Sequence, residues 1–405
     1  MKQNILEGVK VFDFGWAIAG SLATKTLADY GATVIKLESS THVDFMRTNG
    51  FVKGTSSKDP NDKPFYSVLN TSKLGLGLNV KNEYSKEVIT EFYKWADVVF
   101  ENFAPGKIDQ MGLGYEYAKS VNPGIIFVHS SIYGMKGPLA SQSGTDGLGS
   151  SVAAHRGMTG WPDREPRPFS PMVFGDVMLP LMTTSTILAA LDYRRRTGKS
   201  QELDLSMINL VSFKAAPQVV NYAVNGVCER RNGNHVLYAA PHFGYPCAGD
   251  DRWIAIAIYD DEEWKVFRKV LGEPEWAMDP KFETFEGRKD NEDFLDEKIA
   301  EWTKPQMAEQ LECYLQSKGI AAAIVANQQD MQDKDDMMNI REYYVTIPHE
   351  AWGTAKHMRM PFRLSKVKPN LKQGPVLGRD TYKACKLINM SDEQFVKYDQ
   401  AGLFV

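Results

Sequence analysis

The stretch FGDVMLPLM, residues 174–182, places one carboxylate, Asp176, directly before an almost entirely apolar run. Two kinds of chemistry fit this position. Asp is a favoured helix N-cap, and a capping carboxylate that accepts a first-turn amide contributes about 1 kcal/mol. A helix N-terminus also stabilises negative charge, so a carboxylate there can stay ionised in a dry site and attack an activated acyl group. Gly175 would leave space for a substrate, but local chemistry does not decide between cap and nucleophile.

Several other motifs fail in their context. TGKS at residues 197–200 closes a predicted helix, whereas a phosphate-binding loop would open one. His349 and His357 are eight residues apart, which is not the i, i+4 spacing of a zinc pair. There is no GxSxG elbow, and no GxGxxG follows the first strand. The four cysteines lie far apart and form no CxxC, so we expect reduced thiols, no metal and no bound prosthetic group.

Composition narrows the class of protein. The 405 residues are 43% hydrophobic and 24% charged, which is typical of a soluble globular chain with room for two domains. No run approaches the roughly 20 apolar residues of a membrane span. The start, MKQNILEGVKVFDF, lacks an apolar signal core, so we expect a cytoplasmic protein. With a net charge of −4 and no basic face, neither nucleic acid nor membrane is an expected partner.

Strand-like and helix-like stretches alternate through the first 210 residues, and the strand-like ones include VKVFDF, ATVIKLES, DVVFENF and GIIFVHSS. This order predicts a Rossmann-like α/β domain, residues 1–210, with a mostly parallel sheet. Ligands of such folds bind beyond the carboxyl ends of the strands. The loops GWAIAGS, ENFAPG and SSIYGMKGP are therefore the expected binding loops.

The later part of the chain is organised differently. Residues 177–193 predict a buried central helix that Gly198 terminates. Residues 225–329 predict a smaller α+β domain with a hairpin, charged helices and a short strand. Residues 330–405 predict a C-terminal segment that ends in an amphipathic helix near residues 391–401.

Long blocks of the chain resemble the class III CoA-transferases, the formyl-CoA:oxalate and carnitine type. These blocks include LEGVKVFDFGWAIAGSLATKTLADYGATVIKLES, LNTSKLGLGLNVKN, ADVVFENFAPGKIDQMGLGYE, GDVMLPLMTTSTILAALDYRRRTGKSQELDLSM and GPVLGRDT. They follow one another in the family's order and cover nearly the whole chain. The resemblance implies an interlocked dimer in which each chain is threaded through the other, and a tail that returns to the large domain.

The resemblance implies that Asp176 is the nucleophile. It would attack the thioester of a donor acyl-CoA such as succinyl-CoA, and an aspartyl-acyl anhydride and an aspartyl-CoA thioester would follow. These intermediates survive only where water is excluded. The family shields them with a glycine-rich loop, whose best match here is the stretch RRNGNH with Asn232, Gly233 and Asn234. Gly233 could equally be an ordinary turn residue.

For CoA, the resemblance implies backbone contacts and a few side chains. The expected contacts are Ala17, Ile18, Ala19, Lys73, which would reach the phosphates, Asn102 and Phe103. Without the resemblance, Lys73 would be a solvated surface lysine and Phe103 a core aromatic residue. The chain departs from the formyl-CoA enzyme's pattern of basic residues at Ser39, Gln110 and Ser143. The cations that could substitute there are Lys36, Arg47 and Lys136.

Two alternatives stay open at this point. A racemase of the same fold needs a histidine where this chain has Thr145, and a hydroxyl cannot carry protons near neutral pH; His155 lies ten residues further on. A non-catalytic subunit of a hetero-oligomer would explain the missing basic residues. The sequence does not identify the acceptor acid. Aromatic residues together with Arg230 and Arg231 would suit an aromatic or dicarboxylic acid such as benzylsuccinate.

Overall fold

The computed structural model describes residues 4–48, 58–167, 174–351, 353–369 and 371–404, and these form two compact units. The first unit contains Met1–Arg156, Pro168–Cys228 and Asn339–Val405. The second contains Gly157–Arg167 and Glu229–Met338. The sequence predicted a small domain of residues 225–329, and the structure adds the short segment 157–167 to that unit.

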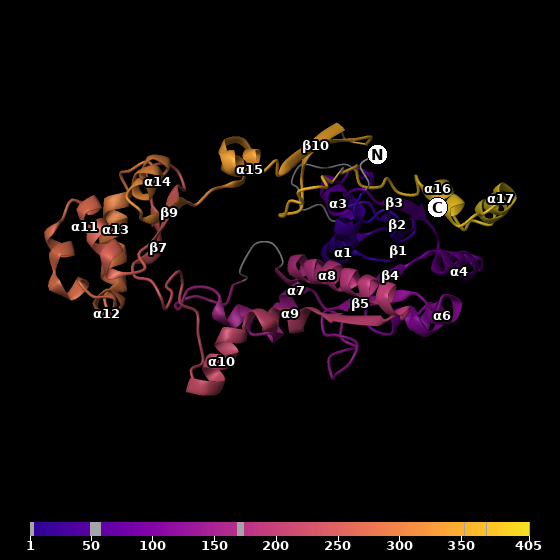
Figure 1. Cartoon of the computed structure of the whole chain (residues 1–405), viewed down its shortest axis with the longest axis horizontal. Helices are drawn as coiled ribbons and strands as arrows, with labels where there is room; N and C mark the ends of the chain where they lie inside the picture. The colour runs from indigo at the N-terminus through magenta and orange to yellow at the C-terminus, as the bar shows by residue number, and fades with distance from the viewer. Residues whose placement is uncertain (1–3, 49–57, 168–173, 352, 370, 405) are drawn as a thin grey trace. The chain divides into compact units, whose positions relative to one another are not determined.

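A six-stranded sheet forms the centre of the first unit, and all of its strand pairs are parallel (Figure 1). Its strand order is β3-β2-β1-β4-β5-β6. The strands are β1 Lys10–Asp13, β2 Thr33–Glu38, β3 Leu74–Gly77, β4 Val98–Glu101, β5 Ile126–Ser131 and β6 Glu202–Ser206. The order reverses between β1 and β4, as in a doubly wound nucleotide-binding fold. The predicted α/β class is therefore confirmed.

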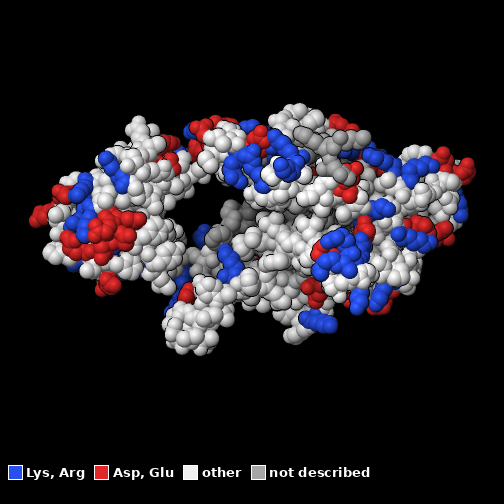
Figure 2. All heavy atoms as spheres, viewed as in Figure 1, with Lys and Arg blue, Asp and Glu red and all other residues white. Residues whose placement is uncertain are grey.

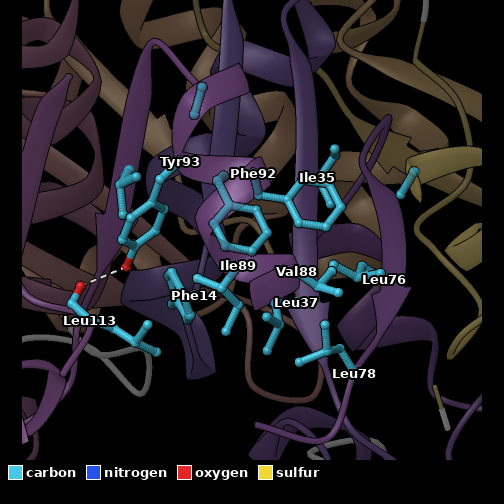
Figure 3. Packing of buried hydrophobic residues seen from close by; sticks show 14 of the residues in the cluster. Phe14, Ile35, Leu37, Leu76, Leu78, Val88, Ile89, Phe92, Tyr93 and Leu113 are labelled. Atoms are coloured by element: carbon cyan, nitrogen blue, oxygen red, sulfur yellow. Dashed lines mark hydrogen bonds between the residues drawn. The ribbon is translucent and has the colours of Figure 1, made fainter. Parts of the chain in front are cut away.

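Apolar clusters cover both faces of this sheet because successive residues of a strand point to opposite sides. Phe12, on one face, packs with Phe92 and Tyr93 of helix α4, Ser85–Trp95. The Tyr93 hydroxyl donates to the Leu113 carbonyl over 2.6 Å, as Figure 3 shows. Val11, on the other face, belongs to a cluster with residues of α1, α8 and α9. The long helices of this unit are α1 Ala17–Asp29, α4 Ser85–Trp95, α6 Tyr115–Val121, α7 Asp146–Val152, α8 Phe174–Thr197, α9 Met207–Lys214 and α10 Ala216–Asn225. The shorter ones are α2 Phe45–Thr48, α3 Pro64–Leu69 and α5 Lys107–Gln110.

Helix α8 is the predicted central helix, and it is buried on one side. Leu179, Thr183 and Ile187 repeat every four residues and are buried, whereas Met178 and Met182 are exposed. Among the described helices, α8 alone has the length and apolar composition of a membrane span. It packs along α1 and beside the sheet, which is the position of a core helix.

The C-terminal segment lies against the first unit. The hairpin of β10 Tyr344–His349 and β11 Gly353–Met358 is followed by α16 Thr381–Leu387 and α17 Asp392–Gln400. The Asp380 carboxylate and the Thr381 hydroxyl accept the β3 amides of Gly75 and Gly77 over 3.1 and 3.0 Å, which fixes this end of the chain to the sheet edge. The predicted final helix is present and begins with a capping box of Ser391 and Gln394.

The second unit contains an antiparallel sheet of order β7-β8-β9 with helices packed on it. Its strands are β7 His242–Pro246, β8 Trp253–Ala257 and β9 Ala321–Ile324. Its helices are α11 Asp261–Leu271, α12 Phe285–Lys289, α13 Glu292–Thr303 and α14 Ala308–Ser317, with α15 Asp336–Ile340 at its boundary. Trp264 and Phe267 of α11 are fully buried in its core, as the predicted α+β pattern requires.

Candidate active site

A cavity of about 290 Å³ opens at the carboxyl end of the parallel sheet, where the loops after β1, β4 and β5 meet the start of α8. The sequence-predicted residues that line it are Ala17, Ala19, Asn102, Phe103, Ser143, Thr145 and Asp176. Ile18 does not line it, because its side chain is buried against Met46, Tyr66 and Leu69. The fold thus brings Ala17 and Asp176 to one cavity, although they are 159 positions apart.

The loop after β1 is held at three successive peptide groups. The Gly15 amide donates to Asp13 Oδ1 over 2.7 Å, and the Ala17 amide donates to Asp44 Oδ1 over 3.2 Å. Between them, Asn102 Oδ1 accepts from the Trp16 amide over 2.8 Å, while Asn102 Nδ2 donates to the Trp16 carbonyl over 3.0 Å. Ala17 has a left-handed backbone with φ of 56°, a strained conformation that these contacts maintain.

Asn102 lines the cavity and is also bound to the loop after β1. Its carboxamide oxygen and nitrogen are both engaged by the Trp16 backbone, and a side chain at Gly20 would lie 2.6 Å from the oxygen. Asn102 therefore positions the loop after β1 at the wall of the cavity. Phe103 and Ala19 line the same cavity.

The surroundings of Lys73 also differ from both expectations, because its side chain is neither solvated nor free to reach a phosphate. Its ammonium is fully buried, 2.9 Å from Asp13 Oδ2, and it also donates to the Ser21 carbonyl over 2.8 Å and to Asn70 Oδ1 over 3.0 Å. Three protein oxygens thus use its three donors. Burial lowers the pKa of Lys73 to about 8, against the opposing effect of Asp13.

Two of the three substitute cations are also inside the protein. Lys36 lies 3.1 Å from Asp44 and Arg47 lies 2.8 Å from Glu38, and all four side chains are buried. Lys136 is exposed, although it does not line the cavity. Of the three departures from the family pattern, Ser39 is buried, Gln110 is exposed in α5 and Ser143 lines the cavity.

Asp176 lies within the first turn of α8, because the helix has already begun at Phe174. It is therefore not the N-cap, and that alternative was wrong. Burial raises the pKa of its carboxyl to about 7, with a further contribution from the nearby negative charge of Asp146. The sequence predicted a carboxylate that stays ionised at the helix terminus, whereas burial and Asp146 raise its pKa.

Asp146 is the site residue that the sequence analysis missed. It is buried at the start of α7, and its Oδ1 accepts the Gly175 amide over 2.5 Å, so this carboxylate holds the first turn of α8. A side chain at Gly175 would meet Asp146 Oδ1 and Met207 Sδ at 2.6 Å each. The space beside Gly175 is thus occupied by protein and is not a substrate channel. The sequence GTDGLG contains no signal that distinguishes Asp146 from another acidic residue at the start of a helix.

The two residues considered for a racemase lie in different surroundings. Thr145 is exposed and lines the cavity. His155 is buried, and its ring stacks on that of Phe174 with the centroids 5.3 Å apart. Burial, together with the charge of Lys214, lowers the pKa of His155. His155 is thus a packed histidine outside the lining of the cavity.

The loop of Asn232, Gly233 and Asn234 belongs to the second unit, where it forms a tight turn. Gly233 has φ of 59°, its amide donates to the Gly160 carbonyl over 2.9 Å, and a side chain there would lie 2.5 Å from the Trp161 ring. The turn and the contact with Trp161 explain why residue 233 is a glycine. Movement of this loop as a lid stays a prediction. Arg231 donates to the Trp161 carbonyl over 3.3 Å, whereas Arg230 is exposed.

No group of three or more His, Cys, Asp or Glu side chains is placed to hold a metal ion within the described ranges. The four cysteines are free thiols, of which Cys247 and Cys385 are buried and Cys228 and Cys313 exposed.

Comparisons with known proteins match nearly the whole chain. The model of the CoA-transferase family III matches residues 6–381. Succinyl-CoA–D-citramalate CoA-transferase of Chloroflexus aurantiacus is 29% identical over 377 residues, which are 92% of this chain and 91% of that protein. Formyl-CoA:oxalate CoA-transferase of Streptomyces coelicolor is 28% identical over 392 residues, 93% of each chain. A CAIB/BAIF family protein from Brucella suis has a crystal structure that superposes with a TM-score of 0.86 at 29% identity, over 95% of this chain and 100% of that one.

Proposed function

Since the chain belongs to CoA-transferase family III, we propose that Asp176 is the nucleophile of its CoA transfer. One observation carries this proposal: Asp176 lines the same cavity as the strained loop after β1 and as Phe103, the positions where the family's pattern implies CoA. A carboxylate whose pKa lies near 7 is also more basic than an ordinary Asp, which makes its ionised form a stronger nucleophile.

CoA moves in two steps, from the donor to Asp176 and from Asp176 to the acceptor, and a thioester is present after each step. The Asp176 carboxylate attacks the acyl carbonyl of the donor, the carbon–sulfur bond breaks, and CoA thiolate leaves an aspartyl-acyl anhydride. The thiolate then attacks the aspartyl carbonyl, which releases the donor acid and forms an aspartyl-CoA thioester. The acceptor carboxylate attacks this thioester and displaces CoA thiolate, which leaves the acceptor joined to Asp176. The thiolate then attacks the carbonyl carbon of the acceptor, which gives the product and regenerates Asp176.

Exclusion of water is a condition for both covalent intermediates. Apolar groups of Phe103, Ile132, Leu179 and Met207 line the cavity around Asp176 and support this condition. Asp146 contributes by holding the Gly175 peptide, so that the Asp176 carboxylate keeps its direction in the first turn of α8.

The acceptor that we propose is a dicarboxylic acid, aromatic examples such as benzylsuccinate included, and the proposed donor is succinyl-CoA. The names of the two relatives above contain citramalate and oxalate, and both of these acids carry two carboxylates. The sequence suggested Arg230 and Arg231 for an acid of this kind; Arg230 is exposed, and Arg231 donates to the Trp161 carbonyl over 3.3 Å. Replacement of Arg230 and Arg231 by alanine should raise the KM for the acceptor.

A second copy of the chain is part of the proposal. Helix α10 has no buried residue, and Val219, Val220, Tyr222 and Val224 on it are each more than half exposed. Such a group of apolar side chains is typical of a surface that a partner covers. The resemblance makes that partner an identical or homologous chain in an interlocked dimer.

The racemase remains the second candidate, because a carboxyl with a pKa near 7 would also suit a general base. Exchange of the α-proton of a 2-methylacyl-CoA with deuterium from solvent would reveal it.

The test of the transferase is peptide mass mapping after the protein has been mixed with succinyl-CoA and hydroxylamine, which converts an aspartyl anhydride or thioester into a stable hydroxamate. Modification should be confined to the peptide that carries Asp176 and should be absent in Asp176→Asn. A matched control is Asp204→Asn, an aspartate at the sheet edge that does not line the cavity. An unmodified Asp176 peptide with several acyl-CoA donors would refute the proposal and favour the racemase or a non-catalytic subunit.

A further inference from the structure

A second cavity of the first unit, of about 300 Å³, lies beside the β10–β11 hairpin, and it is strongly basic. The cationic residues that line it are Arg341, Arg359, Arg363, Lys366 and Lys368. Glu342 is the one acidic residue among its described lining residues, so five positive charges face one negative charge. Figure 2 shows a patch of Lys and Arg atoms in this region, near the position of β10 in Figure 1.

We propose that this cavity, which is separate from the one around Asp176, binds a small anion that carries phosphate groups. The two cavities share no lining residue, and this inference does not depend on the transfer chemistry.

The charges of the cavity are not balanced by the protein. Lys368 Nζ lies 2.5 Å and Arg359 Nη1 lies 3.2 Å from the same Glu342 oxygen, so the single carboxylate already serves two cations. These contacts, the hydrogen bond from Lys368 first, lower the pKa of Glu342, so it is ionised near neutral pH. Arg341, Arg363 and Lys366 have no ion pair or hydrogen bond to another residue in the described ranges. Five cations and one carboxylate line the cavity, so an anion of two or more charges would offset the excess of positive charge.

Arg359 supplies an independent sign of a missing ligand. Its Nε is buried, yet the described residues provide no hydrogen-bond acceptor for it. A buried donor without a partner is costly, and ligand oxygen in the cavity would satisfy it. The guanidinium group is the side chain best suited to a phosphate, since its fork can donate two parallel hydrogen bonds.

Part of the chain that lines the cavity is held in place by contacts with other segments of the first unit. The Phe362 ring stacks on Tyr30 of the first unit with the centroids 5.2 Å apart and the planes at 18°. The Thr26 hydroxyl donates to Met360 Sδ over 3.3 Å, and the Arg359 amide donates to the Tyr343 carbonyl over 2.9 Å at the end of the hairpin. Chain that is already held in place loses less entropy on binding. The volume lies at the lower end of the range of small-ligand sites and fits one or two phosphate groups.

Equilibrium dialysis of the full-length protein with radiolabelled inorganic pyrophosphate tests this proposal at low and at physiological ionic strength. The site variant is Arg341→Ala/Arg363→Ala. The matched control is Lys304→Ala/Lys383→Ala, which also removes two exposed cations without a described ion pair. A third variant, Glu342→Gln, removes the carboxylate among the described residues that line this cavity. Thermal unfolding followed by circular dichroism verifies that each variant is folded.

The site variant should bind pyrophosphate at least tenfold more weakly than the wild type, the control should bind equally, and Glu342→Gln should bind several-fold more tightly. Binding should weaken as salt screens the charges. Competition by adenosine 3′,5′-bisphosphate would assign the phosphate to a nucleotide end such as that of CoA, and its absence would assign it to a free inorganic anion. Equal affinities of the wild type and the site variant, or no binding by the wild type at low salt, would overturn the inference.

Discussion

Replacement of Asp146 by Asn separates the two roles that the structure gives to this carboxylate. Asparagine keeps an oxygen for the Gly175 amide, which Asp146 Oδ1 accepts over 2.5 Å, but it removes the negative charge beside Asp176. If that charge helps to hold the pKa of Asp176 near 7, the variant should titrate at lower pH. The geometry of the first turn of α8 should be retained.

The size of the expected pKa shift follows from the surroundings of Asp176. Its pKa of about 7 lies about 3 units above the ordinary value of 3.8, and burial contributes more than Asp146 does. The share of Asp146 is therefore below half of the rise, and we expect a downward shift of about 1 pH unit, equivalent to about 1.4 kcal/mol. The ionised fraction at pH 6 would then rise from about one tenth to about one half, about fivefold.

The assay is the pH profile of kcat/KM for CoA transfer, whose acid limb reports the nucleophile of the free enzyme. Because the nucleophile acts ionised, activity should rise with pH through about 7 in the wild type and through about 6 in Asp146→Asn. Asp146→Ala is the control: it removes the charge and also the acceptor for Gly175, and the unpaired buried amide costs about 1–3 kcal/mol of stability. An acid limb of Asp146→Asn that coincides with that of the wild type, in a variant of normal thermal stability, would refute this reasoning.

Further predictions concern variants of three residues, Asp176, Lys73 and Gly175. Asp176→Asn should lower kcat for transfer by at least about a thousandfold, since the covalent route is lost. Because the folded-state pKa of Asp176 is raised, ionisation removes stability as pH rises from about 4 to about 7; Asp176→Asn should thus gain stability relative to the wild type at pH 8 but not at pH 4, as urea unfolding at both values would show. Lys73→Met should destabilise the protein by about 3–5 kcal/mol, because it leaves Asp13 buried without its partner; Lys136→Ala, on the exposed surface, should leave stability unchanged, and equal melting temperatures of the two variants would contradict the buried ion pair. Gly175→Ala should lower both stability and kcat, because its methyl group would lie 2.6 Å from Asp146 and from Met207, and a variant with wild-type kinetics would show that the α8 turn does not need this close contact.

The sequence by itself determined the elements of the fold and the identity of the nucleophile candidate. Consecutive apolar residues such as those of β1 and β5 can be buried only in a strand that is covered on both faces, and their alternation with helical stretches requires a parallel sheet. The carboxyl ends of those strands then had to carry the site. Asp176 was selected because the blocks around it follow the order of one family.

Tertiary structure alone decided what surrounds each of these residues. Lys73 looked like a solvated or ligand-binding lysine, and only the fold places it against Asp13, 60 residues earlier. Asp146 acquires its role from Gly175, 29 residues later, and Asn102 from Trp16, 86 residues earlier. Burial and pKa depend on such distant contacts, whereas local sequence fixes only backbone preference and the periodicity of side chains. The cavity beside Asp176 and the basic cavity therefore form only when the chain has folded.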